Sequence, residues 1–118
     1  EKRATEEGLV GIVQVRRADL EREASSGVEP GTADWTLLAN ILHQADPVAV
    51  FKEARRITKP GGVVLAVEWE TAASPLGPPT EKRVPKSVIT VAAEQAGLHV
   101  QREFKPSPYH YGLVCALA

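Results

Sequence analysis

The chain has 118 residues, of which 43% are hydrophobic, enough for the core of one small domain. Its formal net charge is −1 and its charges are interspersed, so nothing favours binding to nucleic acid or to an anionic membrane. A single cysteine, Cys115, excludes an internal disulfide framework and, with a charged amino terminus, predicts a cytoplasmic protein. No apolar run approaches the ~20 residues of a membrane span.

The first third of the chain predicts a helix end, a strand and a loop. Residues 1–7 are charged and compatible with a helix that Gly8 ends. Residues 11–18 alternate apolar and polar side chains, which favours a strand. Residues 21–32 are polar and predict a loop, since they show no apolar periodicity.

A strand, a helix and a second strand are predicted next, over residues 35–42, 47–58 and 62–69. Asp46 is a helix N-cap type, and a proline follows it at the first helical position. The run 63–67 is almost entirely apolar, as in parallel strands that helices cover on both faces. Short connections in this order predict a right-handed crossover unit and an α/β fold.

The last third of the chain predicts a long loop, a helix and two strands. Proline and glycine interrupt residues 71–83, which favours a loop. Residues 85–96 place apolar side chains on one helical face. The strands are expected at 98–104 and 111–117, the latter containing Cys115 as a buried structural thiol.

Several segments resemble class I S-adenosylmethionine-dependent methyltransferases. Residues 34–43, Asp-Trp-Thr-Leu-Leu-Ala-Asn-Ile-Leu-His, resemble the fourth strand of that family. Residues 55–62, Arg-Arg-Ile-Thr-Lys-Pro-Gly-Gly, resemble the turn before its fifth strand, and residues 18–20 the acidic turn after its third. Residues 74–79, Ser-Pro-Leu-Gly-Pro-Pro, together with 81–83 (Glu-Lys-Arg) and 109–112 (Tyr-His-Tyr-Gly), resemble a narrower branch related to the quinone-biosynthesis C-methyltransferases.

The resemblance implies a Rossmann-like three-layer sandwich in which the chain, residues 1–118, is one partial domain. Its sheet would be mostly parallel, with the antiparallel last strand, 111–117, inserted between 62–69 and 98–104. The family also carries an amino-terminal Gly-x-Gly-x-Gly turn that contacts the cofactor, and we find no such cluster in this sequence. We therefore expect the chain to start after the family's first two strands and, alone, to bind S-adenosylmethionine weakly or not at all.

By resemblance, Asp19 and Leu20 would contact the adenine of S-adenosylmethionine, and Asn40 would face its sulfonium end. His43 would lie on the substrate side as a candidate catalytic base. The alternative for Asp19 is capping of local N–H groups. For His43 the alternative is packing and hydrogen bonding in the turn between strand and helix.

Glu68 and Trp69 end the next strand and would border a substrate pocket, although Trp69 fits equally well as a core aromatic. Residues 109–111 are expected to form a surface aromatic turn. No metal site is predicted, because the three histidines and Cys115 lack ligand spacing.

Two functions remain open from the sequence. The chain is either part of a methyltransferase acting on a small molecule, or a non-catalytic α/β fragment that self-associates without binding S-adenosylmethionine. Without the family's first strands, residues 35–42 would form an open sheet edge. We expect this edge to be covered either by residues 11–18 moving across or by a second chain in a homodimer.

Overall fold

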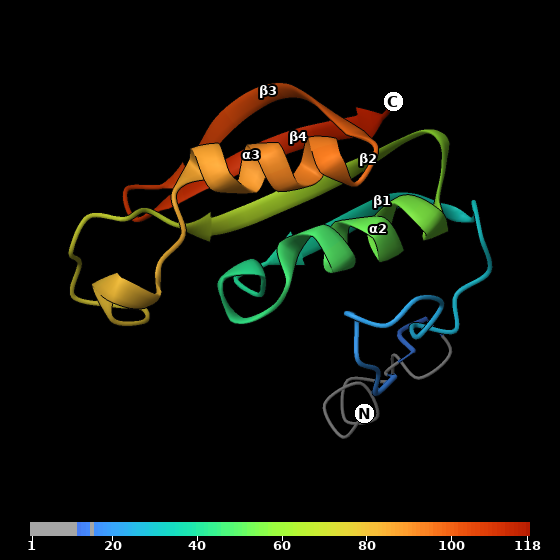
Figure 1. The fold of residues 1–118 in the computed structure, drawn as a ribbon, viewed down its shortest axis with the longest axis horizontal. Coiled ribbons are helices and arrows are strands. Elements are labelled where there is room, and N and C mark those ends of the chain that lie inside the picture. Colours follow the sequence, from blue (N-terminus) through green and yellow to red (C-terminus); the bar gives the residue numbers. More distant parts are fainter. Residues whose placement is uncertain (1–11, 15) are drawn as a thin grey trace.

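The structure, a computed structural model, describes residues 12–14 and 16–118 and is built around a mixed sheet with helices packed on it (Figure 1). In chain order its elements are β1 (Ala33–Ala39), the 3-10 helix η1 (Leu42–Gln44), α2 (Pro47–Ile57), β2 (Thr58–Trp69), the 3-10 helix η2 (Thr80–Lys82), α3 (Lys86–Gln95), β3 (Leu98–Ser107) and β4 (His110–Leu117).

The sheet has the strand order β1-β2-β4-β3. β1 and β2 are parallel, with Leu37 opposite Leu65, whereas β4 runs antiparallel to both β2 and β3. β1, β2 and β3 therefore share one direction. This confirms the predicted, mostly parallel sheet with its last strand inserted antiparallel between the two preceding strands.

Capping explains why α2 begins and ends where it does. The Asp46 side chain accepts hydrogen bonds from the N–H groups of Val48 (3.1 Å) and Ala49 (3.5 Å), as the N-cap prediction requires. At the other end, the Thr58 hydroxyl donates to the Ala54 carbonyl at 2.6 Å. β2 begins at this Thr58, four residues earlier than predicted, because Ala33 pairs with Thr58 before the register shifts.

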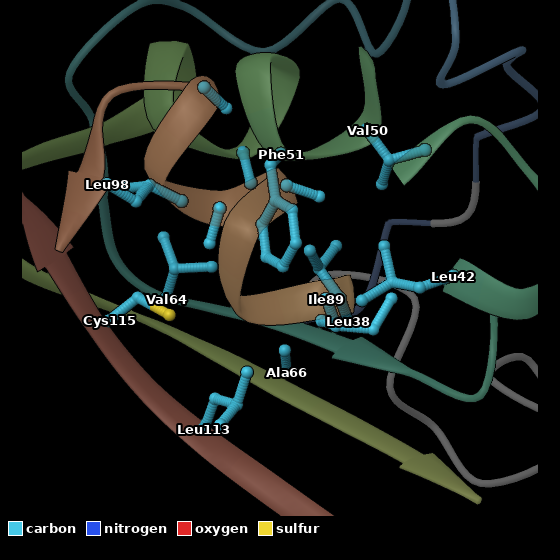
Figure 2. Packing of buried hydrophobic residues seen from close by; sticks show 14 of the residues in the cluster. Leu38, Leu42, Val50, Phe51, Val64, Ala66, Ile89, Leu98, Leu113 and Cys115 are labelled. Carbon is cyan, nitrogen blue, oxygen red and sulfur yellow. The ribbon is translucent and has the colours of Figure 1, made fainter. Parts of the chain in front are cut away.

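The core lies between the sheet and the layer formed by α2 and α3 (Figure 2). Phe51 from α2, Ile89 from α3, and Val64 and Leu113 from the sheet are fully buried there. Cys115 is buried in the same cluster, and burial raises the pKa of its thiol to about 11. The thiol is thus the structural one that the sequence predicted.

The two α-helices, α2 and α3, cover the same face of the sheet (Figures 1 and 2). On the other face, Trp35 and Leu37 of β1 are 67% and 61% exposed. Side chains alternate along a strand, and Thr36 and Leu38 are the ones buried toward the helices. Of the three layers predicted, the described residues thus form two, the sheet and one layer of helices.

Three sequence predictions need correction. The expected surface turn over 109–111 does not hold for Tyr111, which lies in β4 and is buried. Residues 12–14 and 16–18 form no strand, although their alternation favoured one, because a strand forms only where a neighbour pairs with its backbone. Gly11 and Val15, and the predicted helix over 1–7, lie outside the described residues. The strand predicted to reach Leu42 ends at Ala39, because Asn40 takes a left-handed conformation with φ +59°.

A buried carboxylate ties the segment before β1 to α2. Glu53 accepts hydrogen bonds from the N–H groups of Ala24 (3.0 Å) and Ser26 (3.2 Å), and from the Ser26 hydroxyl at 2.5 Å. Arg56 completes the cluster, with its Nη2 2.6 Å from Glu53 Oε2. The hydrogen bond from Arg56, followed by those from Ser26 and Ala24, lowers the pKa of Glu53 from 4.5 to about 2 despite its burial.

The stability of the chain should therefore depend on pH through Glu53. The depressed pKa stabilises the fold above pH 4.5, and this contribution is lost as the pH falls toward about 2. From the size of the shift, the loss is about 3 kcal/mol in the free energy of unfolding. Urea denaturation at pH values between 4.5 and 2 should show this loss in the free energy of unfolding for the wild type, whereas Glu53→Gln should lack the part that comes from Glu53. The exposed-site variant Glu81→Gln should keep the wild-type pH dependence, and an equal flattening in both variants would contradict the assignment.

Candidate functional site

The ends of β1 and β2 bring several polar side chains to one edge of the sheet. The Asn40 N–H donates to the Val67 carbonyl at 2.9 Å, which places the end of β1 beside Glu68 at the end of β2. From there the chain turns through η1 into α2. Open α/β sheets bind ligands at the carboxyl ends of their parallel strands, so this edge is the candidate site.

His43 and Glu68 form a buried pair at this edge. His43 Nδ1 lies 2.5 Å from Glu68 Oε1 and 3.0 Å from Oε2, and the His43 backbone N–H donates to Oε1 at 3.3 Å. The two side chains are only 6% and 1% exposed. η1 positions the histidine, and the alternation of β2 directs the carboxylate toward the helical face.

This contact determines how the histidine can react. An ionised carboxylate only accepts hydrogen bonds, so Nδ1 of His43 must carry the proton that bridges to Glu68. In the neutral imidazole the lone pair then lies on Nε2. Glu68 thus leaves Nε2 as the nitrogen able to accept a proton, while its negative charge stabilises the imidazolium that results.

Asn40 occupies a strained position at the same edge. Its φ of +59° lies in the left-handed region, which asparagine tolerates better than most residues. Its Oδ1 atom is buried and has no hydrogen-bond partner among the described residues. An unpaired buried acceptor is costly and rare in native structures, which marks this oxygen as available to a donor from a ligand.

Trp69 follows Glu68 but points to the opposite face of the sheet, because successive strand residues alternate. Its ring centroid lies 4.1 Å from that of His110, and the Arg83 guanidinium lies over it at 5.5 Å. Glu68 and Trp69 therefore contact different neighbours on opposite faces of the sheet, and the structure does not bring these two predicted pocket residues together. The sequence included Arg83 in a segment, residues 81–83, that resembles the narrower branch, but it assigned the arginine no role, because no local pattern shows what a single arginine after a Pro-rich loop will contact.

Asp19 and Leu20 lie in a turn before β1. The Asp19 side chain accepts from the Glu21 N–H at 3.1 Å, as the local-capping alternative anticipated, and the residue is exposed. Leu20 packs against the edge of the core cluster. The neighbouring Glu21 accepts from the Asp46 N–H at 3.2 Å, which ties this turn to the start of α2.

The described residues contain no group of three or more His, Cys, Asp or Glu side chains arranged to hold a metal ion. None of their helices combines the length and apolarity that crossing a membrane requires.

The comparisons with known proteins identify the family. The sequence profile described as "Methyltransferase domain" matches residues 1–66, more than half of the chain, so the chain belongs to this methyltransferase domain family. A search of curated proteins finds no match.

Solved methyltransferase structures share the fold. A SAM-dependent methyltransferase from Aquifex aeolicus matches with a TM-score of 0.87 at 21% identity, over 99% of this chain and 61% of that one. A protein from Sulfolobus solfataricus assigned as a type 11 methyltransferase matches with a TM-score of 0.67 at 30% identity, over 76% and 53%.

NcsB1, an O-methyltransferase from neocarzinostatin biosynthesis, matches with a TM-score of 0.78 at 24% identity, over 99% of this chain and 38% of NcsB1. The NcsB1 structure holds S-adenosyl-L-homocysteine and 1,4-dihydroxy-2-naphthoic acid. The chain thus spans less than two thirds of each of these three proteins. The Rossmann-like methyltransferase fold predicted from the sequence is confirmed.

The His43–Glu68 pair should contribute measurably to stability. Glu68→Gln keeps the size of the side chain but removes the charge that accepts from His43, and hydrogen bonds to charged groups are worth about 1.5–3 kcal/mol. We expect a loss of that order in the free energy of unfolding, measured by urea denaturation. Glu94→Gln makes the same change at an exposed position on α3 and should cost less than about 0.5 kcal/mol. Equal losses in the two variants would argue against the pair.

Proposed function

We propose that the chain forms part of an S-adenosylmethionine-dependent methyltransferase that acts on a small molecule. The observation that carries this proposal is the His43–Glu68 pair at the carboxyl edge of a methyltransferase fold, an edge that also holds the Asn40 oxygen without a partner among the described residues. The family match and a solved neighbour that holds S-adenosyl-L-homocysteine support the same cofactor. The free buried thiol, Cys115, fits a cytoplasmic setting.

The residues at this edge fit S-adenosylmethionine chemically. The unpaired Asn40 Oδ1 is an acceptor for a donor such as the ammonium group of the cofactor's methionine end. Asp19 is exposed and accepts through one carboxylate oxygen, leaving the other for an adenine amino group. When bound, the cofactor supplies an electrophilic methyl group on its sulfonium.

His43 acts in this proposal as the general base. Its Nε2 takes the proton of the acceptor group that becomes methylated, and Glu68 holds the ring and stabilises the resulting imidazolium. A base is needed most when the nucleophile is a hydroxyl or an activated carbon that must lose a proton. An aromatic acceptor of the kind used in quinone biosynthesis, as the segment 74–79 suggests, would meet that need.

The alternative is a non-catalytic fragment that does not bind S-adenosylmethionine. The glycine turn and ribose carboxylate normally give the cofactor several hydrogen bonds of about 0.5–3 kcal/mol each. Without three or four of them, this chain should bind about two to four decades more weakly than a complete family member. Micromolar binding would contradict this expectation.

Amide NMR titration separates the two functions, because it detects weak binding residue by residue. If the proposal holds, S-adenosylmethionine at high concentration should cause saturable shifts at Asp19, Leu20, Asn40 and His43. Asp19→Asn should weaken the effect, because it removes the charge of the proposed adenine contact. Asp34→Asn, at the amino end of β1, is the matched control and should titrate like the wild type. A titration with no saturable shift at these residues would favour the non-catalytic alternative.

We also propose that the chain forms a homodimer through β1. Within the described residues β1 pairs only with β2, so its outer edge presents unpaired backbone groups beside exposed Trp35 and Leu37. An apolar exposed edge of this kind favours pairing with another strand. A second copy in a symmetric arrangement would cover both edges at once.

Analytical sedimentation tests this association. Leu37→Lys places a charge on the proposed contact and should shift the protein to monomer, since charged edge residues oppose strand pairing. Leu76 is equally exposed, at 61%, but lies in the loop after β2, so Leu76→Lys should leave the dimer intact. A wild-type protein that stays monomeric, with rapid hydrogen exchange along β1, would refute the dimer.

A further inference from the structure

Arg83 places a positive charge inside the protein at the end of the loop that follows β2. The residue is only 8% exposed. Its guanidinium donates to five oxygens of the loop, those of Glu70 (3.2 Å), Ala72 (2.7 Å), Ser74 (3.0 Å, the hydroxyl), Leu76 (2.9 Å) and Pro78 (2.9 Å). All of these partners are neutral dipoles, so this buried charge is balanced by carbonyl and hydroxyl groups.

The spacing of these partners shows how the loop is folded. Every second residue from 70 to 78 directs an oxygen to the same guanidinium. The guanidinium reaches these acceptors through all three nitrogens, with the two N–H groups of Nη1 shared among three oxygens, a spread that a lysine ammonium cannot match from one nitrogen. The loop is therefore curled around Arg83.

The same loop covers Trp69. The Arg83 Cζ atom lies 5.5 Å from the Trp69 ring centroid, within the range of a cation–π contact. Gly77 approaches so closely that an added Cβ would lie 2.7–2.8 Å from three ring atoms, and its φ is +92°. With His110 at 4.1 Å, the indole is held by side chains and backbone from three segments.

Both ends of the loop are fixed to the strand hairpin formed by β3 and β4. The Glu70 N–H donates to the Tyr109 carbonyl at 2.8 Å. Beyond the loop, the Tyr111 hydroxyl donates to the Val84 carbonyl at 2.7 Å. Hydrogen bonds thus hold both ends of the loop, and Arg83 holds its centre, so that Gly77 lies directly on the Trp69 ring.

We propose that Arg83 is a positioning residue that holds the loop of residues 70–83 closed on Trp69. Trp69 then forms a preformed aromatic wall at the end of β2, on the face of the sheet opposite the His43–Glu68 pair. That this wall faces a methyl acceptor rests on the proposed function, whereas closure of the loop does not.

Fluorescence quenching and hydrogen exchange test the closure without cofactor or acceptor. In a Trp35→Phe background, Trp69 is the only tryptophan, so acrylamide quenching reports its exposure alone. Arg83→Met and Arg83→Lys should both increase quenching and speed exchange of the Lys82 and Arg83-position amides, which η2 protects. We expect exchange to be faster by about tenfold or more, because several charge-assisted hydrogen bonds are lost together. Lys82→Met, a neighbouring charge outside the cluster, is the matched control and should behave like the background protein.

Each outcome bears on the proposal. Unchanged quenching and exchange in Arg83→Met would overturn it, and wild-type behaviour of Arg83→Lys would likewise contradict it, because the guanidinium fork would then not be what holds the loop. If circular dichroism shows that Arg83→Met does not fold, Gly77→Ala provides a second route, since its Cβ would push the loop off Trp69 while leaving Arg83 in place. Gly77→Ala should then raise Trp69 quenching, and no change would refute the closed contact. These readouts use no S-adenosylmethionine, so they fail independently of the proposed function.

Discussion

The parallel register between β1 and β2 is the constraint on which the candidate site depends. Leu37 lies opposite Leu65 and Ala39 opposite Val67, and the Asn40 N–H continues this ladder to the Val67 carbonyl. A shift by one residue would turn every side chain of β1 to the other face. The buried Leu38 and the Thr36–Thr58 hydroxyl contact at 2.7 Å oppose such a shift. The same register brings η1, and with it His43, beside Glu68.

Glu68 continues the row of β2 side chains that faces the helices, after Val64 and Ala66. A carboxylate in such a row is costly unless it is paired, and buried ion pairs are often no more stabilising than apolar residues of the same size. The His43–Glu68 pair is therefore poorly explained by stability alone. Its placement at the carboxyl edge, where the Asn40 oxygen also has no partner among the described residues, fits the proton transfer that we propose for this site.

The face of the sheet away from α2 and α3 is not covered by any helix of the described residues. Trp35 and Leu37 are largely exposed on it, and exposed apolar surface on an edge strand favours association. The segment before β1 is held on α2 through Glu53. In the described residues, the segment before β1 is therefore bound to α2 by hydrogen bonds and does not cover the exposed Trp35 and Leu37 of β1.

The sequence by itself determined the elements from residue 33 onward and the family. Caps at Asp46, the Pro-Gly-Gly stop after α2 and the apolar run in β2 act within a few residues of the chain, so they can be read locally. The sequence also indicated the candidate residues His43 and Glu68, but it assigned them to different roles. Their contact joins residues 25 positions apart, and only the strand register brings them together.

Tertiary structure decided the remainder for the same reason. Alternation over residues 11–18 could not show whether a partner strand was present, and no periodicity predicts that Arg83 would bind loop oxygens from every second residue between 70 and 78. The local chain specifies which conformations are favourable. The choice among them depends on non-local partners for backbone groups and buried charges, and these are supplied only once the sheet and its loops have come together.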